Sequence, residues 1–218
     1  STSGSSVCPN TSTFGVTIAV AGISNVYSMN FDGINDYISI DTTETLPPNT
    51  GDFTFSGWFY RDSTGAGTHC YFEKGALYPG AGILVRDSSN TGLIEIYYNG
   101  FGAIQFSNLT SYNTPNNWHH IALVYNESGN TLTAYVDGNS EQKSVTTTLN
   151  VTDSVFLIGK RQNNSNYWRG NIDEIGFWNA ALTAPQIAQI YNATSTGKTA
   201  DLSTISGSNL KYWNRMGD

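Results

Sequence analysis

Short apolar stretches separated by turn residues repeat along the chain from Phe14 onward. Many of them alternate apolar and polar positions, and runs of this length between Gly, Asn, Asp and Pro are typical of β-strands. The dipeptides at 99–100 (Asn-Gly) and 137–138 (Asp-Gly) are typical of tight turns between antiparallel strands. We expect strands near residues 16–20, 37–40, 53–60, 70–73, 83–85, 93–98, 118–125, 131–136, 155–159 and 170–178.

One segment departs from this pattern and predicts a helix. The sequence TAPQ at 183–186 has the form of a capping box with Pro in the first turn. In the residues that follow, Ile187, Ile190 and Tyr191 share one helical face. Many short strands with a single helix predict an all-β fold, an antiparallel two-sheet sandwich with one short C-terminal helix.

The two ends of the chain differ from its middle. Residues 1–13 are rich in Ser and Thr, which predicts an exposed arm or linker. Residues 14–195 carry the strand pattern and form the predicted domain, and residues 196–218 are expected to be a linker or C-terminal extension. Because the chain starts at Ser1 without Met, we expect either a lost leader or a piece of a longer chain.

Composition narrows the classes of function. Only 12% of the residues are charged and 39% are hydrophobic, so the chain is not a disordered protein. No apolar run reaches the ~18 residues of a membrane-spanning helix, so no membrane insertion is expected. The net charge of −7 argues against nucleic acid as a partner. Abundant Asn, Ser and Thr suit neutral ligands such as sugars and an extracellular location.

Cys8 and Cys70 fit one bridge or two free thiols equally well.

Several segments resemble the motifs of laminin-G-like domains of the concanavalin A-like lectin/glucanase superfamily. They occur in the family's order across residues 27–192, and this resemblance implies a jelly-roll sandwich. The tail at 212–218 resembles a segment found after such domains in modular surface proteins of phages and marine bacteria, which implies that the chain continues beyond it. The segments are FDGINDYI at 31–38, FTFSGW at 53–58, WHHIALVY at 118–125, LTAYVDG at 132–138, GNIDEI at 170–175 and NAALT at 179–183.

The superfamily includes retaining β-glucanases, which place two carboxylates on one face of a strand. In the corresponding segment here, Asn171 stands where the first acid would be and Gly176 where another could be. Asp173 and Glu174 are adjacent, so on a regular strand they point to opposite faces. We therefore expect no enzyme activity of this type. The resemblance also implies that His120 is a core residue.

The turn at 32–36 predicts a metal site. It places Asp32, Asn35 and Asp36 within five residues, and oxygen ligands of this kind suit calcium. The resemblance implies that Asp32 and Asp173 anchor the ion, with Asp36 or Asn35 completing the ligand set. The alternative is that the two aspartates only cap a tight turn.

Three loops are candidate ligand-binding segments, because a rigid sandwich displays its loops at one edge. Sugar recognition combines an aromatic face with amides, which hydrogen-bond hydroxyl groups. Tyr78 and Phe101 each place an aromatic side chain in a turn. The third loop carries Asn164, Asn166 and Tyr167, while the next residue, a tryptophan, occupies a core position in the resembling family.

Two functions fit these observations, and the fold does not choose between them. The first is a non-catalytic carbohydrate-binding or adhesion module of an extracellular or virion surface protein, with a glycan or a cell-surface protein as partner. The second is a structural or decoration domain of a phage or another extracellular assembly, with mainly protein contacts. A glycan hydrolase ranks below both.

Overall fold

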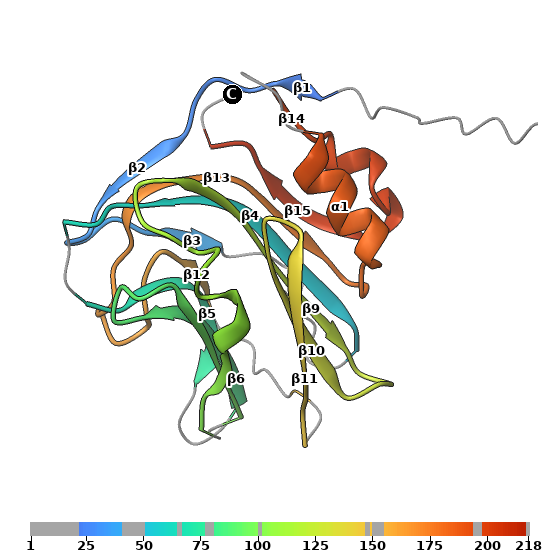
Figure 1. Cartoon of the computed structure of the whole chain (residues 1–218), viewed down its shortest axis with the longest axis horizontal. Coiled ribbons are helices and arrows are strands. Elements are labelled where there is room, and N and C mark those ends of the chain that lie inside the picture. The colour runs from blue at the N-terminus through green and yellow to red at the C-terminus, as the bar shows by residue number, and fades with distance from the viewer. Residues whose placement is uncertain are drawn as a thin grey trace, which may run out of the picture.

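Two antiparallel β-sheets packed face to face form a sandwich in the computed structural model (Figure 1). The structure describes residues 22–40, 51–64, 67–76, 81–99, 102–146, 149, 155–193 and 198–216. The sandwich and the short helix predicted from the sequence are confirmed. The strands are β1 (Ile23–Ser24), β2 (Met29–Asp32), β3 (Ile38–Ile40), β4 (Phe53–Arg61), β5 (His69–Ala76), β6 (Ala81–Ser88), β7 (Leu93–Tyr98), β8 (Ile104–Phe106), β9 (Trp118–Asn126), β10 (Thr131–Val136), β11 (Asn139–Ser144), β12 (Phe156–Ile158), β13 (Arg169–Trp178), β14 (Lys198–Thr199) and β15 (Leu210–Asn214).

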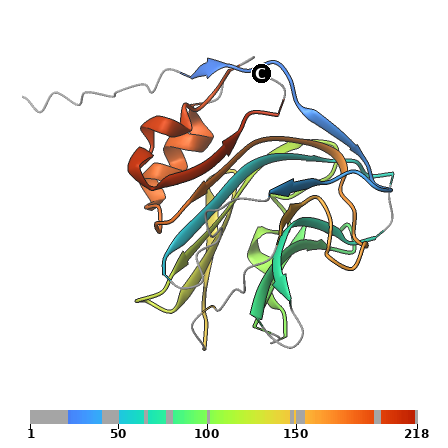
Figure 2. The ribbon, with the colours of Figure 1, turned by 180° about the vertical axis from the view of Figure 1, so that it is seen from behind.

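The larger sheet has seven strands in the order β11-β10-β9-β4-β13-β15, and β2 pairs with β13 beside β15. The smaller sheet has the order β3-β12-β5-β6-β7-β8. Seen from either side, the larger sheet curves over the smaller one (Figures 1 and 2). Three chain connections meet at one rim of the sandwich: β2 to β3, β4 to β5, and β12 to β13. This rim carries the candidate site.

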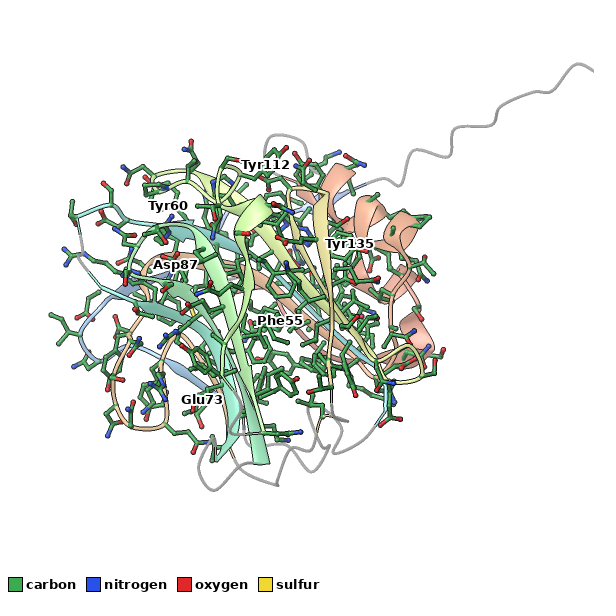
Figure 3. The ribbon with its side chains drawn as sticks, turned by 60° about the horizontal axis from the view of Figure 1, so that its bottom comes forward. Phe55, Tyr60, Glu73, Asp87, Tyr112 and Tyr135 are labelled. Atoms are coloured by element: carbon green, nitrogen blue, oxygen red, sulfur yellow. The ribbon has the colours of Figure 1, made fainter. Side chains whose placement is uncertain are left out.

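Alternation along β4 shows how one strand serves two faces. Phe53 and Phe55 point into the core between the sheets and are fully buried. Phe55 contacts Phe72 of the smaller sheet at a ring-centroid distance of 4.4 Å, and Figure 3 shows it in the interior. Trp58 points the other way, to the outer face, where it stacks on Tyr191 of the helix. The aromatic residues at 53–60 therefore pack on both faces of β4, against the smaller sheet on one side and against the helix on the other.

The helix α1 (Ala184–Asn192) covers part of the outer face of the larger sheet (Figure 1). The predicted capping box is present, because Gln186 and Thr183 exchange side-chain to backbone hydrogen bonds. Ile187 and Ile190 are buried against the sheet. No helix within the described ranges has the length and apolarity needed to cross a membrane.

The C-terminal segment completes the larger sheet. β15 pairs with β13, and Leu202 and Ile205 are buried beside Trp178. The structure therefore places residues 198–216 in the fold, whereas the sequence predicted a linker or extension there. The described part of the chain also contains the short 3-10 helices η1 (Ser107–Leu109), η2 (Leu202–Thr204) and η3 (Gly207–Asn209).

Some predictions concern residues outside the described ranges. They include the strand at 16–20, the arm at 1–13 and Cys8. The other cysteine, Cys70, is buried with a free thiol, and burial raises the pKa of that thiol well above its usual value.

Candidate functional site

The turn after β2 is held by its own carboxylates. Asp32 Oδ1 accepts hydrogen bonds from the backbone N–H groups of Ile34 at 2.7 Å and Asn35 at 3.3 Å. Asp36 Oδ2 accepts one from the Asp32 N–H at 2.9 Å. Gly33 adopts the left-handed conformation that the turn requires, with φ of +79°. The two aspartates therefore cap the turn, as the alternative interpretation of this motif predicted.

The loop between β12 and β13 is also fixed in shape. Asn164 and Asn166 both have positive φ, which asparagine tolerates better than most residues. The backbone N–H of Gln162 donates to the buried carboxylate of Glu73 at 2.8 Å, and the Asn166 carbonyl accepts from Cys70 N at 2.9 Å. Burial raises the pKa of Glu73. These bonds anchor the loop to β5.

A hollow of about 430 Å³, called the loop hollow here, lies between this loop and the turn after β2. Asn166 and Tyr167, two of the predicted ligand-binding residues, line it. Its other walls come from the β2–β3 turn and the β4–β5 connection. Its lining residues are Gly33, Gly67, Thr68, His69, Asn166, Tyr167 and Arg169.

A second hollow of about 320 Å³, called the sheet hollow here, adjoins the first at Arg169. Arg169 Nε lies 3.5 Å from Asp62 Oδ2, so its charge is compensated by a neighbouring carboxylate. A hydrogen bond from the Thr64 N–H is the main cause that lowers the pKa of Asp62. The lining residues are Asn30, Phe31, Asp32, Tyr60, Asp62, Arg169, Gly170 and Asn171.

Asn164, the third predicted ligand residue of the loop, lies on its other side. Its Oδ1 accepts a hydrogen bond from Lys160 Nζ at 3.0 Å. Lys160 Nζ in turn lies 3.6 Å from the ring centroid of Tyr37. Lys160 and Tyr37 line a third hollow of about 360 Å³ beside the edge strand β3 and its neighbour β12. Asn164 therefore does not join Asn166 and Tyr167. The candidates Tyr78 and Phe101 lie outside the described residues.

A buried polar network lies behind the loop hollow. Arg61 pairs with Asp87 at 3.2 Å, and the Arg61 guanidinium donates to the Asn113 carbonyl at 2.8 Å. His69 Nδ1 is 3.8 Å from Asp87 Oδ2, which is too long for a hydrogen bond. Both of these atoms are buried and have no hydrogen-bond partner among the described residues, although Asp87 Oδ2 is the atom that forms the ion pair with Arg61. This network could not be predicted from the sequence, because His69 and Asp87 meet only through strand pairing.

The three predicted calcium ligands do not meet at one point. In the pairing of β2 with β13, Asp32 lies opposite Arg169. Asp173 is four residues further along β13, about 13 Å away at the usual rise of a strand. Among the described residues, no cluster of three or more His, Cys, Asp or Glu side chains could hold a metal ion. A calcium site at Asp32 and Asp36 stays a prediction.

The expected opposite orientation of Asp173 and Glu174 is wrong. A β-bulge interrupts the pairing of β13 with β4 after Asp173, and Glu174 has a φ of +50°. As a result, Asn25 Nδ2 donates to Asp173 Oδ2 at 3.0 Å and to Glu174 Oε1 at 2.7 Å. Both carboxylates are nevertheless buried under the two terminal segments, with exposures of 8% and 3%. Neither can reach a substrate in this structure.

Glu174 ties these terminal segments to the sheet. Its Oε1 accepts from Thr199 Oγ1 at 2.6 Å, and its Oε2 accepts from the indole N–H of Trp213 at 2.5 Å. Arg215 Nε lies 3.5 Å from the same carboxylate. We call Asn25, Asp173, Glu174 and these partners the carboxylate hub. Its contacts assign it a structural role.

Solved structures with the same fold share little sequence with the chain. A protein from Bacteroides ovatus ATCC 8483, described as a candidate carbohydrate-binding protein, has a TM-score of 0.65 at 16% identity and covers 90% of this chain and 53% of its own. The chain thus spans about half the length of that protein. The CBM40 of the Ruminococcus gnavus IT-sialidase, bound to α2,3-sialyllactose, has a TM-score of 0.57 at 9% identity, with 78% and 96% covered.

Domains LG4-5 of the mouse laminin α1 chain are also similar, with a TM-score of 0.54 at 15% identity and 72% and 41% covered. Identities this low show a shared fold alone. A comparison with curated proteins found no match. The family described as the concanavalin A-like lectin/glucanases superfamily matches residues 32–188, which is most of the chain. The chain therefore belongs to the concanavalin A-like lectin/glucanases superfamily.

Proposed function

We propose that the protein is a non-catalytic carbohydrate-binding module of an extracellular or surface protein, with the loop hollow as its binding site. The observation that carries this proposal is the lining of that hollow. Asn166 and Tyr167 of the β12–β13 loop and Thr68 of the β4–β5 connection line it together. Amides and hydroxyls hydrogen-bond sugar hydroxyl groups, and an aromatic ring packs against sugar C–H groups.

Among the described residues, the loop hollow has no carboxylate pair, and this favours binding over hydrolysis there. Glycoside hydrolases of the usual kind need two carboxylates on either side of the bond that breaks. The described residues that line the loop hollow include no Asp or Glu, and the Asp173–Glu174 pair is buried in the carboxylate hub. Two similar structures carry carbohydrate-binding descriptions, which adds support.

A glycan array with the isolated protein tests the proposal. We expect the wild type to bind a defined group of glycans and Tyr167→Ala to lose at least tenfold in affinity. Tyr112→Ala is the matched control, because Tyr112 is 44% exposed and lines none of the three hollows described above. Its binding should stay within twofold of the wild type. A silent array with folded wild-type protein would contradict the proposal.

A structural role with mainly protein contacts is the second candidate, and one observation favours it. Val26 and Tyr27 precede the edge strand β2 and Met29 is its first residue, with exposures of 69%, 62% and 47%. Exposed apolar side chains this close together suit a protein partner. A silent array combined with sedimentation that shows self-association, lost in Tyr27→Ser, would support this role.

A further inference from the structure

Four side chains form a line across the outer face of the larger sheet. In the strand pairing, Asn30 of β2 lies opposite Asn171 of β13, Asn171 lies opposite Tyr60 of β4, and Tyr60 lies opposite Trp118 of β9. Residues paired in this way point to the same face. At the usual spacing between strands, the line from Asn30 to Trp118 is about 14 Å long. We call it the cross-strand row.

This part of the outer face lies beyond the helix. Trp58, two residues before Tyr60 on the same face, is covered by Tyr191 of α1. Trp118 by contrast is 39% exposed, and Asn30 is exposed as well. Figure 3 shows Tyr60 toward one edge of the molecule, apart from Tyr135 near the helix. The cross-strand row is therefore open to a ligand.

The row combines fixed amides with an aromatic corner. Asn30 Nδ2 donates to Asn171 Oδ1 at 3.2 Å, and Asn171 Nδ2 donates to Ser28 Oγ at 3.0 Å, so these bonds set how both amides point. The rings of Tyr60 and Trp118 lie 5.9 Å apart with their planes tilted by 59°. Two ring faces at an angle can hold the apolar side of a sugar, while amides bind its hydroxyl groups.

The row is continuous with the loop hollow. Asn30, Tyr60 and Asn171 line the sheet hollow, and Arg169 separates that hollow from the loop hollow. The charge here does not favour an anionic ligand. The Arg169 guanidinium is paired with Asp62, the carboxylate of Asp32 lines the same hollow, and the whole chain carries −7.

We propose that the protein binds a neutral oligosaccharide of several residues that crosses Arg169, with one end in the loop hollow and the rest along the cross-strand row. This inference rests on the proposed carbohydrate-binding function and names its ligand class. A chain that extends beyond the ~14 Å of the row can occupy both areas, whereas a disaccharide in the loop hollow leaves the row empty. Affinity should therefore grow with chain length, and the row should supply that growth.

Calorimetry with cello-, laminari- and chito-oligosaccharides of two and six residues, and with α2,3-sialyllactose, tests the inference. We expect the wild type to bind one of the neutral hexasaccharides at least tenfold more tightly than its disaccharide. Trp118→Ala should lose this gain and keep the disaccharide affinity within twofold. Tyr167→Ala should weaken both lengths, and Tyr112→Ala neither.

Asn30→Ala is the second variant, because Asn30 is an exposed residue on an edge strand and its loss is compatible with folding. It should weaken the hexasaccharide about threefold. Two results would overturn the inference and leave carbohydrate binding intact. The first is an unchanged hexasaccharide affinity in both Trp118→Ala and Asn30→Ala. The second is binding of α2,3-sialyllactose by a protein that binds none of the neutral hexasaccharides. Loss of carbohydrate binding altogether would instead show as a silent array with the wild type.

Discussion

The two halves of strand β13 have opposite surroundings on the outer face of the sheet. Residues 169–172 pair with β2, and residues 169–171 line open hollows at the rim. Residues 173–178 lie beside β15 and under the terminal segments, where Trp178 is fully buried. Polar side chains occur in both halves. In the open half Asn171 is partly exposed, while in the covered half Glu174 has four protein partners.

This difference shows that residue type alone does not mark a functional carboxylate or amide. The β-bulge at Glu174 turns two adjacent acids toward the same protein donors, which makes them part of the fold. Regular pairing in the open half instead lines up residues from four strands on one surface. In this chain, the outer positions of one strand change from structural to available for a ligand within a few residues.

The largest expected effect is the loss of stability when a residue of the covered half of β13 is replaced. Glu174→Ala removes an acceptor from Asn25, Thr199, Trp213 and Arg215, and the partly buried Thr199 hydroxyl and Trp213 indole N–H lose the acceptor that they have in the wild type. Removal of one member of such a buried, charged network costs about 3–5 kcal/mol of unfolding free energy. Urea denaturation followed by Trp fluorescence measures this loss.

The glycan affinity of the same variant tests whether the two halves of β13 act independently. At a temperature where Glu174→Ala is still folded, its affinity should equal that of the wild type, because Glu174 lines none of the three hollows. Glu174→Gln keeps one acceptor oxygen and should lose less stability. A drop in binding larger than the folded fraction explains would show that the two halves are coupled.

The second-largest expected effect is a loss of stability at acid pH, and it also arises on the covered part of the outer face. His120 is fully buried next to Trp58, and burial lowers its pKa to about 4. The unfolded chain takes up this proton near pH 6.5, so stability is complete above that pH and falls as the pH drops toward 4. Between pH 7.5 and 4.5 this group alone accounts for about 2.5 kcal/mol.

His120→Gln is the control, because it removes the titration and keeps a polar side chain opposite Ser56, whose hydroxyl lies 2.7 Å from His120 Nε2. Urea denaturation at both pH values gives the comparison. The variant should lose about 2.5 kcal/mol less than the wild type over this range. Equal losses would mean that other groups cause the acid sensitivity.

The fold could be predicted from the sequence where strands are long and strongly patterned. The aromatic alternation at 53–60 and the capping box at 183–186 were sufficient, because each specifies its element locally. The edge strands β2 and β15 were missed. Their sequences are mixed, and they are strands because β13 offers them a partner.

The residues of the candidate site also divide into those that could be predicted from the sequence and those that could not. The amides and ring at Asn166 and Tyr167 could be found from composition, since one loop carries them. The cross-strand row could not, because Asn30, Tyr60 and Trp118 are far apart in the sequence and meet only through the register of four strands. The bulge at Glu174 likewise depends on partners that are distant along the chain.

The smallest expected effect concerns calcium at the turn of the open half. Among the described residues, this turn itself supplies two carboxylates, Asp32 and Asp36, so we expect weak binding, with a dissociation constant of about 0.1–1 mM as in other weak extracellular sites. Calcium at twice the dissociation constant would add about 0.6 kcal/mol, or a melting shift of about 1–2 °C. Thermal melts in calcium and in chelator measure the shift.

Asp32→Asn sharpens this test, because the amide oxygen can still accept the hydrogen bonds from Ile34 and Asn35 while the charge is lost. The turn should persist and the calcium shift should disappear. Asp173→Asn should lower stability through the carboxylate hub but keep the shift, since Asp173 lies about 13 Å along the strand. A shift that depends on Asp173 would join the two halves of β13 through one ion, and no shift in the wild type would leave both aspartates as caps of the turn.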